Sequence, residues 1–382
     1  MKKYLFFLFV LIGCCLNAQT ALYNSGNIRI HPQGQIGFHT DLINDAPFDE
    51  NVGLAGFYGN AQLNVLGALP PTFFDVEIAN LNGVFLQTGI NNSNNTNFVM
   101  GNFLTPRTDP NTNYNFLQQS FYVGDNEIAK VDGYAAITLK QNFIFPVGDD
   151  NQLRPLVLNS ESENTQARCA YFYEDPNNPV SIGERYPTLN KQRDIGFISS
   201  TEFWRLEGNI PSAISISWNL RSDIIALTDD VSIILIVGFS KAENRWVALG
   251  TPTGVGDLNT GIATSATFIP DDFDAITFGT MDVPAEYLDL DNYLVSVNGD
   301  GINEALLIPE LEQSPNNHLK IYNRFGQMVF DQPNYTDQFI GFSNVDNLVM
   351  DRRQGLPSGV YFYIVDMIDL GLEFQGFLYL TR

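Results

Sequence analysis

Cysteine is scarce in this chain, with three residues in 382, and two of them, Cys14 and Cys15, lie near the N-terminus. Once that pair is removed with the leader described below, Cys169 has no partner for an internal disulfide and cannot build a multi-cysteine metal site. Cys169 lies in the strand-like run 167–172, where a buried structural thiol is expected rather than a nucleophile. The cysteine pattern therefore suits an exported protein that folds without disulfides.

Basic residues are also few. The chain has 20 Lys and Arg against 43 Asp and Glu, which gives a formal net charge of −23. Such an anionic surface repels phosphate backbones and anionic lipid headgroups, and no local basic stripe offsets it. We therefore expect no nucleic-acid partner.

Catalytic and metal-binding signatures are missing as well. The three histidines, His31, His39 and His318, show neither a His-x-His nor a His-Glu-x-x-His spacing, so zinc is not supported. No Gly-x-Ser-x-Gly elbow nominates a nucleophilic serine, although a triad drawn from distant positions stays open. No phosphate-binding loop and no dinucleotide motif in a strand–helix context is present. We expect no enzyme activity and no cofactor.

The residues that dominate helical proteins are under-represented, whereas the chain has 31 Gly, 29 Phe, 16 Tyr and abundant Asn. Apolar residues make up 44% and charged residues 16%, a balance opposite to that of disordered chains. The composition predicts an all-β, multi-domain protein, and the length suits two or three domains.

The first 18 residues have the layout of a secretory signal peptide. Lys2 and Lys3 precede an apolar run, and Ala18 offers a small residue for cleavage before Gln19. The run is too short for a transmembrane helix, which needs about 20 apolar residues. A second interpretation remains open, because Leu-Ile-Gly-Cys at 11–14 resembles the lipobox of bacterial lipoproteins. No later stretch is apolar enough to span a bilayer, so the mature protein is expected to be soluble or attached.

Residues 19–144 predict a β-rich region built of short strands. Alternating runs occur at 27–31, 76–79 and 83–86, glycines recur between them, and helical spacing is missing. A short β-solenoid is the leading interpretation, although no strict repeat period is visible. Nine asparagines fall within 91–115, which we interpret as a solvated loop with one strand at 101–105.

Residues 145–280 predict an Ig-like β-sandwich. Seven or eight alternating or continuously apolar runs follow one another, including 201–206, 214–218 and 231–237. All three tryptophans of the chain lie in this segment and are expected in its core, and the alternative is an aromatic sugar-binding strip. Three acidic pairs flank turns, and we interpret them as solvated loop tips rather than as glycosidase or metal-binding carboxylates. The residues are Trp204, Trp218 and Trp246, with the acidic pairs 149–150, 229–230 and 271–272.

Residues 281–285 are interpreted as a linker, since Pro284 breaks strand pairing. Residues 286–382 alternate again, and turn residues separate the runs, with a hairpin turn expected at Asn323-Arg324-Phe325-Gly326. This pattern predicts a small C-terminal antiparallel β-sandwich with its own core. Its last strand reaches Thr381-Arg382, so the terminus is expected to be held in the sheet.

This last quarter of the chain also carries five short motifs in order. They are Asn298-Gly299-Asp300-Gly301-Ile302-Asn303-Glu304, Tyr322-Asn323-Arg324-Phe325-Gly326, Phe339-Ile340-Gly341, Pro357-Ser358-Gly359-Val360-Tyr361-Phe362-Tyr363 and Gly376-Phe377-Leu378-Tyr379-Leu380-Thr381-Arg382. Together they resemble the C-terminal sorting domain of Bacteroidetes proteins exported by the type IX secretion system, in its gliding-motility-associated (type B) form. The chain departs from that pattern at Val297, Glu304 and Phe339, where the family usually has Pro, Asp and Trp.

The resemblance implies that residues 286–382 direct passage through the outer membrane, with the type IX secretion machinery as partner. The protein is then expected to cross the periplasm and to reach the cell surface or the medium. The residues that match the sorting motifs are Asn298, Gly299, Asp300, Gly301, Asn303, Tyr322, Asn323, Arg324, Gly326, Gly341, Gly359, Tyr361, Tyr363, Gly376 and Arg382.

The opening motif also imitates a calcium-binding loop. Ser296 stands where an Asp would be the first ligand, and Leu307 stands where a bidentate carboxylate is needed, so a plain turn is expected. The alternative is a variant Ca²⁺ site whose ligands are Asn298, Asp300, Asn303 and Glu304.

The favoured function is that of a non-catalytic exported protein whose passenger, residues 19–280, is adhesive or structural. Surface glycans or other surface proteins are its expected partners. The alternative is a secreted carbohydrate-binding protein or hydrolase, because aromatic side chains in 145–280 offer faces on which sugars stack.

Overall fold

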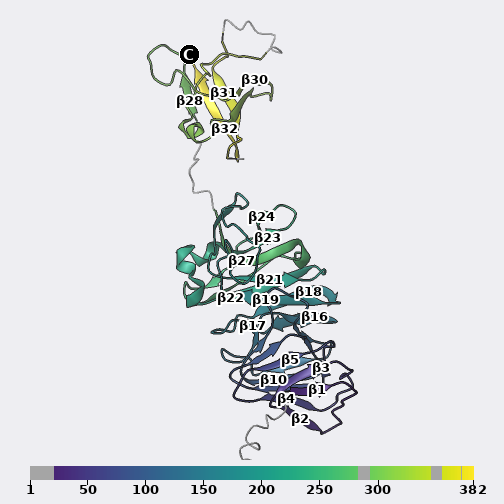
Figure 1. Cartoon of the computed structure of the whole chain (residues 1–382). Coiled ribbons are helices and arrows are strands. Elements are labelled where there is room, and N and C mark those ends of the chain that lie inside the picture. Colours follow the sequence, from purple (N-terminus) through teal and green to yellow (C-terminus); the bar gives the residue numbers. More distant parts are fainter. Residues whose placement is uncertain (1–20, 283–292, 346–354, 371) are drawn as a thin grey trace, which may run out of the picture. The chain divides into compact units, whose positions relative to one another are not determined.

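The computed structural model describes residues 21–282, 293–345, 355–370 and 372–382. The predicted signal peptide, its cleavage site at Ala18 and Gln19, and residues 283–285 of the linker lie outside the described residues. The chain divides into two compact units, Met1–Val283 and Pro284–Arg382, each considered by itself (Figure 1). We call them the passenger unit and the C-terminal unit. Within the described residues, no helix has the length and apolarity needed to cross a membrane.

The first part of the passenger unit is a parallel β-solenoid, as predicted. Three parallel ladders run along it, and strands of the first ladder begin at residues 21, 41, 63 and 84, so one turn takes about 20 residues. The ladders consist of β1 (Ala21–Asn24), β3 (Asp41–Asn44), β5 (Leu63–Leu66), β8 (Val84–Leu86), β11 (Phe103–Leu104), β14 (Val131–Asp132) and β17 (Val147–Gly148); β2 (Gln35–Phe38), β4 (Leu54–Tyr58), β7 (Asp75–Ala79), β10 (Asn95–Met100) and β13 (Phe121–Val123); and β6 (Thr72–Phe73), β9 (Ile90–Asn92), β12 (Tyr114–Phe116) and β15 (Ala135–Ile137).

Aromatic rings from successive turns fill the solenoid interior. Phe38 stacks on Phe57 with ring centroids 5.0 Å apart, Phe57 meets Phe103 edge to face at 5.7 Å, and Phe103 lies 4.5 Å from Tyr114. Offset and edge-to-face pairs at these distances add to the stabilisation from area burial, by about 0.5–1.5 kcal/mol each. The recurring phenylalanines therefore hold one turn against the next.

The prediction of a solvated loop at 91–115 is wrong, because four strands cross this segment. Its asparagines stack between turns. The Asn91 amide donates to Thr72 Oγ1 at 3.3 Å, the Asn115 amide to Asn91 Oδ1 at 2.9 Å, and Thr138 Oγ1 to Asn115 Oδ1 at 3.1 Å. Asparagine is poor in isolated strands, but in stacked parallel strands its amides bond from one layer to the next.

The predicted strand at 27–31 is also absent. These residues form no strand, and the Ile30 amide donates instead to the side chain of Asn51 at 2.8 Å. Alternation alone did not distinguish a strand from a loop whose amide is bonded by a side chain.

Antiparallel strands continue the third ladder into a ten-stranded sheet, in the order β24-β23-β27-β21-β19-β15-β12-β9-β6, with β20 paired to β27. A second, five-stranded sheet has the order β16-β18-β22-β26-β25. The added strands of the large sheet are β19 (Ala167–Phe172), β20 (Ile195–Ile198), β21 (Phe203–Glu207), β23 (Ile234–Ser240), β24 (Arg245–Ala248) and β27 (Phe273–Met281). Those of the second sheet are β16 (Lys140–Phe145), β18 (Leu156–Asn164), β22 (Ser212–Trp218), β25 (Val255–Gly256) and β26 (Gly261–Thr264). The short 3₁₀ turns between them are η1 (Leu220–Ser222), η2 (Ile224–Ala226), η3 (Val231–Ile233) and η4 (Pro270–Asp272).

The two sheets pack face to face around Trp204 and Trp218, whereas Trp246 lies in a separate buried cluster beside Phe239, so all three have the predicted core position. Trp218 of the small sheet meets Phe278 of the large sheet edge to face at 5.7 Å, and Trp204 meets the same ring at 5.8 Å. Trp204, Trp218 and Trp246 are at most 1% exposed. They cannot form a surface strip for sugars.

The start of the predicted strand 231–237 is corrected by the structure. Val231–Ile233 is η3, and only Ile234–Ser240 is a strand. Asp230 caps η3, since its side chain accepts a hydrogen bond from the Ser232 amide at 2.9 Å. This polar cap competes with the extended conformation that the apolar pattern favours.

One hydrophobic core runs from the solenoid into the sandwich, from Ile30 to Phe278. The ten-stranded sheet contains both β6, before residue 145, and β27, after it. The two predicted segments of the passenger thus share a sheet and a core, and the division near residue 145 stays a prediction.

The C-terminal unit has one five-stranded sheet in the order β28-β32-β31-β29-β30. All neighbours are antiparallel except β28 and β32, which run parallel. Loops and η5 (Pro309–Gln313), rather than a second sheet, cover its buried face among the described residues. Apolar residues in those loops are irregularly spaced, which suits turns and not strands. The strands are β28 (Tyr293–Ser296), β29 (Asn317–Asn323), β30 (Met328–Pro333), β31 (Gly359–Met367) and β32 (Leu372–Thr381).

Candidate functional site: one end of the C-terminal sheet

The strand directions bring four separate motif pieces to one end of the C-terminal sheet. β29 ends there at Asn323, β31 begins there at Gly359, and β28 and β32 both end there, at Ser296 and Thr381. Gly341 joins them, because a Cβ on it would lie 3.1 Å from Leu380 Cδ1. We call this region the motif end. It gathers segments that are up to 85 residues apart in sequence, from Ser296 to Thr381.

The β29–β30 hairpin presents two exposed side chains at the motif end. Asn323 Oδ1 accepts from the amides of Phe325 and Gln327, each at 3.0 Å, so the asparagine closes the turn. Arg324 and Phe325 then point into solvent, with Phe325 79% exposed and the guanidinium 4.8 Å from its ring. An exposed aromatic ring beside a cation is typical of a contact residue.

Arg382 is bound at the same end. Its Nη2 donates to Gly341 O at 3.1 Å, and its guanidinium lies 5.0 Å from the Phe342 ring. It also lies against Gly355, where an added Cβ would come within 1.3 Å of Nη2. The terminal arginine of the motif therefore lies against two described stretches of the connection between β30 and β31.

A pocket of about 260 Å³ lies between the hairpin and the start of β31. Tyr361 lines it and donates its hydroxyl to Pro357 O at 2.8 Å. Burial raises the pKa of Tyr361, while the nearby Arg382 and Arg324 act in the opposite direction. Four predicted sorting residues line this pocket: Asn323, Arg324, Gly359 and Tyr361.

The opening motif forms a self-bonded turn. Asn298 Oδ1 accepts from the Asp300 amide at 3.0 Å, Asp300 Oδ1 accepts from the Ile302 amide at 2.8 Å, and Glu304 Oε1 accepts from the Gly301 amide at 3.3 Å. The bond from the Ile302 amide, and a further one from the Asn298 side-chain amide to Asp300 Oδ2 at 2.9 Å, hold the pKa of Asp300 below its usual value. In the part of the chain that the structure describes, no group of three or more His, Cys, Asp or Glu side chains could hold a metal ion. The calcium alternative, which also includes Asn303, stays a prediction.

Three sorting residues lie on the sheet itself. Tyr322, Tyr363 and Gly376 belong to β29, β31 and β32, and Tyr363 pairs with Gly376 across the strands. They line a hollow of about 580 Å³ together with Phe362 and Phe377. Tyr363 and Gly376 lie in mid-strand, whereas Tyr322 directly precedes Asn323 and shares the hollow with Gly326 of the hairpin turn.

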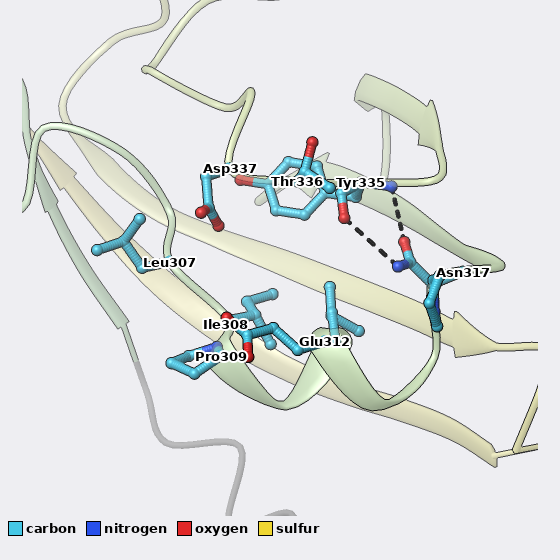
Figure 2. A pocket seen from close by; sticks show the side chains of 10 residues that line it. Leu307, Ile308, Pro309, Glu312, Asn317, Tyr335, Thr336 and Asp337 are labelled. Carbon is cyan, nitrogen blue, oxygen red and sulfur yellow. Dashed lines mark hydrogen bonds between the residues drawn. The ribbon is translucent and has the colours of Figure 1, made fainter.

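A second pocket, of about 370 Å³, lies at the opposite end, where β29 begins (Figure 2). Asn317 ties its wall together, accepting from the Tyr335 amide at 2.8 Å and donating to Ser314 O at 2.8 Å. Ile308 and Leu311 give it an apolar lining, while Glu312 and Asp337 supply carboxylates. None of the predicted sorting residues lines this pocket.

The remaining candidate residues have structural partners. Cys169 is fully buried in β19, and burial raises the pKa of its thiol well above the usual value. His318 pairs with Asp331. The prediction that Asp149 is a solvated loop tip is wrong, because Asp149 forms an ion pair with Arg221 at 2.7 Å. The other two acidic pairs are exposed, in line with the prediction.

Two groups of residues were missed by sequence reasoning. Arg154 and Glu202 form a buried ion pair, 48 residues apart, with no local signal in the sequence. On the outer face of the solenoid, Tyr58 and Asn97 both donate hydrogen bonds to Glu77. Their spacings of 19 and 20 residues follow the solenoid period, which was the signal that could have found them.

A small β domain on the C-terminal side of a larger β passenger, with its turn motifs at one sheet end, has the arrangement of a C-terminal sorting domain. Residues 288–380 match the model of the CHU_C type IX secretion signal domain. Neither a curated protein nor a solved structure gives a match. The C-terminal unit is thus a type IX sorting domain, a family that implies a Bacteroidetes origin, and the protein is exported to the cell surface or secreted.

Proposed function

We propose that the exported passenger is a non-catalytic adhesive or structural element, and that the secretion machinery reads the motif end. The observation that carries the first part is the single core shared by the solenoid and the sandwich. Stacked parallel turns joined to a sandwich form a stiff body that presents strand faces to the outside. Such a body suits a spacer or an adhesive surface.

The chemistry of the passenger supports this proposal. The most buried carboxylate, that of Glu202, bonds to Arg154 and Tyr171 and not to an open cavity. The thiol of Cys169 is inaccessible. These two groups therefore serve packing rather than acid–base or nucleophilic chemistry.

A carbohydrate-binding passenger is the second candidate, and a hydrolase is its catalytic variant. The buried tryptophans no longer support it, but the outer solenoid face at Tyr58 does, as argued below. Incubating the exported protein with polysaccharides tests the catalytic variant, since release of reducing ends would contradict a non-catalytic role.

The reading of the motif end is tested with a reporter fused to residues 286–382 in a type IX-competent bacterium. We expect the reporter in the medium or on the surface, and Arg324→Glu to leave it in the periplasm. Glu312→Lys at the opposite end is the matched control and should export normally. Equal export of both variants would contradict the proposed reading surface.

The adhesive role is tested on whole cells. A strain that lacks the protein should attach less to a glycan-coated or cell-coated surface than its complemented parent. Equal attachment with normal cell shape and surface layer would refute both an adhesive and a structural role.

A further inference from the structure

On the outer face of the β2-β4-β7-β10 sheet, the aromatic rings of Tyr58 and His39 are neighbours. We call this pair of rings the aromatic floor. Tyr58 bends back over Gly56, where an added Cβ would lie 2.2 Å from the Tyr58 Cζ. Gly37 lies beside both rings at looser contact, since an added Cβ there would be 3.3 Å from Tyr58 Cδ2 and 3.4 Å from His39 Nε2. The two rings lie side by side, with centroids 5.7 Å apart. Only glycine at position 56 leaves room for the Tyr58 ring to lie on the strand.

A chain of hydrogen bonds fixes the tyrosine ring. The Tyr58 hydroxyl donates to Glu77 Oε1 at 2.9 Å, and the Asn97 amide donates to Glu77 Oε2 at 2.8 Å. Burial, with help from the Glu77 carboxylate, raises the pKa of Tyr58 to about 12, so the hydroxyl keeps its proton under all physiological conditions. Each of these three side chains comes from a different turn of the solenoid, and each remains partly exposed.

We propose that this face binds a neutral hexopyranose of a surface polysaccharide, with the sugar ring stacked on Tyr58. The C–H face of a pyranose packs on an aromatic ring that is already immobile, so little conformational entropy is lost on binding. The Glu77 carboxylate has acceptor positions beyond the two in use, and these suit neighbouring sugar hydroxyls. His39 extends the floor and offers a ring nitrogen to a hydroxyl.

Charge decides between classes of glycan. Glu77 stands at the centre of the site, and the chain carries a net charge of −23. Uronic and sialic acids would therefore meet repulsion from both the site and the whole surface, whereas neutral sugars would not. The inference rests on the proposed adhesive function and adds the ligand class and the site.

The test uses the full mature chain on a glycan array, followed by titration calorimetry with the best neutral oligosaccharide. We expect binding of neutral glycans, a loss of at least tenfold in affinity for Tyr58→Ala, and less than a threefold loss for Tyr58→Phe, which keeps the ring. Gly56→Ala should also weaken binding at least tenfold, because its methyl group displaces the ring. Tyr23→Ala is the matched control, since Tyr23 is 58% exposed on a different ladder.

Three outcomes would overturn the inference: no neutral glycan bound, preference for acidic glycans, or unchanged affinity in Tyr58→Ala with an unchanged melting temperature. The proposed adhesive function can be refuted independently of the Tyr58 site. Loss of cell attachment in the deletion strain, with full rescue by the Tyr58→Ala protein, would keep adhesion and remove this site.

Discussion

Replacing Arg154 by Met is expected to destabilise the passenger unit strongly, because it leaves a buried carboxylate without its cation. The Arg154 and Glu202 side chains are 2% and 0% exposed. They are joined by two hydrogen bonds, Nη2 to Oε1 at 2.7 Å and Nε to Oε2 at 3.2 Å. Tyr171 adds a third bond to the carboxylate at 2.6 Å. Removing one partner of such a pair costs about 3–5 kcal/mol.

Tryptophan fluorescence measures this loss in the passenger unit alone. The chain has three tryptophans, and all of them, including Trp204 against the Arg154 guanidinium, lie in that unit. Urea unfolding of the mature protein gives the free energy of unfolding. In a thermal scan, the same loss corresponds to a fall of roughly 6–20 °C, at about 2–4 °C per kcal/mol for a large domain.

Two control variants separate burial from charge. Arg168→Met breaks the half-buried pair with Glu207, whose side chains are 21% and 27% exposed, and should cost about 1 kcal/mol or less. Arg154→Met combined with Glu202→Met removes the stranded charge and should recover part of the lost stability. The reasoning fails if Arg154→Met loses no more free energy than Arg168→Met.

Three further predictions concern single groups. Although burial alone would raise it, hydrogen bonds from Arg221 and neighbouring amides hold the pKa of Asp149 below its usual value. Its contribution to stability is then complete above about pH 4 and is lost as the pH falls further, so Asp149→Asn should flatten the acid side of the stability profile, measured by urea unfolding across that range. Cys169 should react with a thiol reagent only after unfolding, and rapid labelling of the native processed chain would contradict its burial. Gly355→Ala should displace Arg382 and lower export of the reporter fusion. Export equal to that of the unmutated fusion would show that the position of Arg382 has no role in export.

The sequence predicts this structure best where the determining contacts are local. The turn at Asn323–Gly326 follows from residues that bond within the turn itself, and so it was predicted correctly. The Asn-rich stretch was predicted as a loop because single-residue preferences describe only local structure. Asn91 and Asn115 instead bond to partners one turn of the solenoid away.

The same limit applies to the candidate sites. The motif residues were identified as a set, but their convergence depends on strand directions, and the parallel pairing of β28 with β32 is not visible in any single motif. The floor around Tyr58 escaped notice because its members repeat only at the solenoid period, which irregular insertions between the strands conceal.

The place of β32 within the C-terminal sheet has a consequence for biosynthesis. It lies between β28 and β31, so β28 has no neighbour in that sheet until Leu372–Thr381 has left the ribosome. A chain that stops before β32 therefore lacks a complete sorting domain, however well its passenger folds. We therefore expect a product truncated before β32 to stop short of the cell surface.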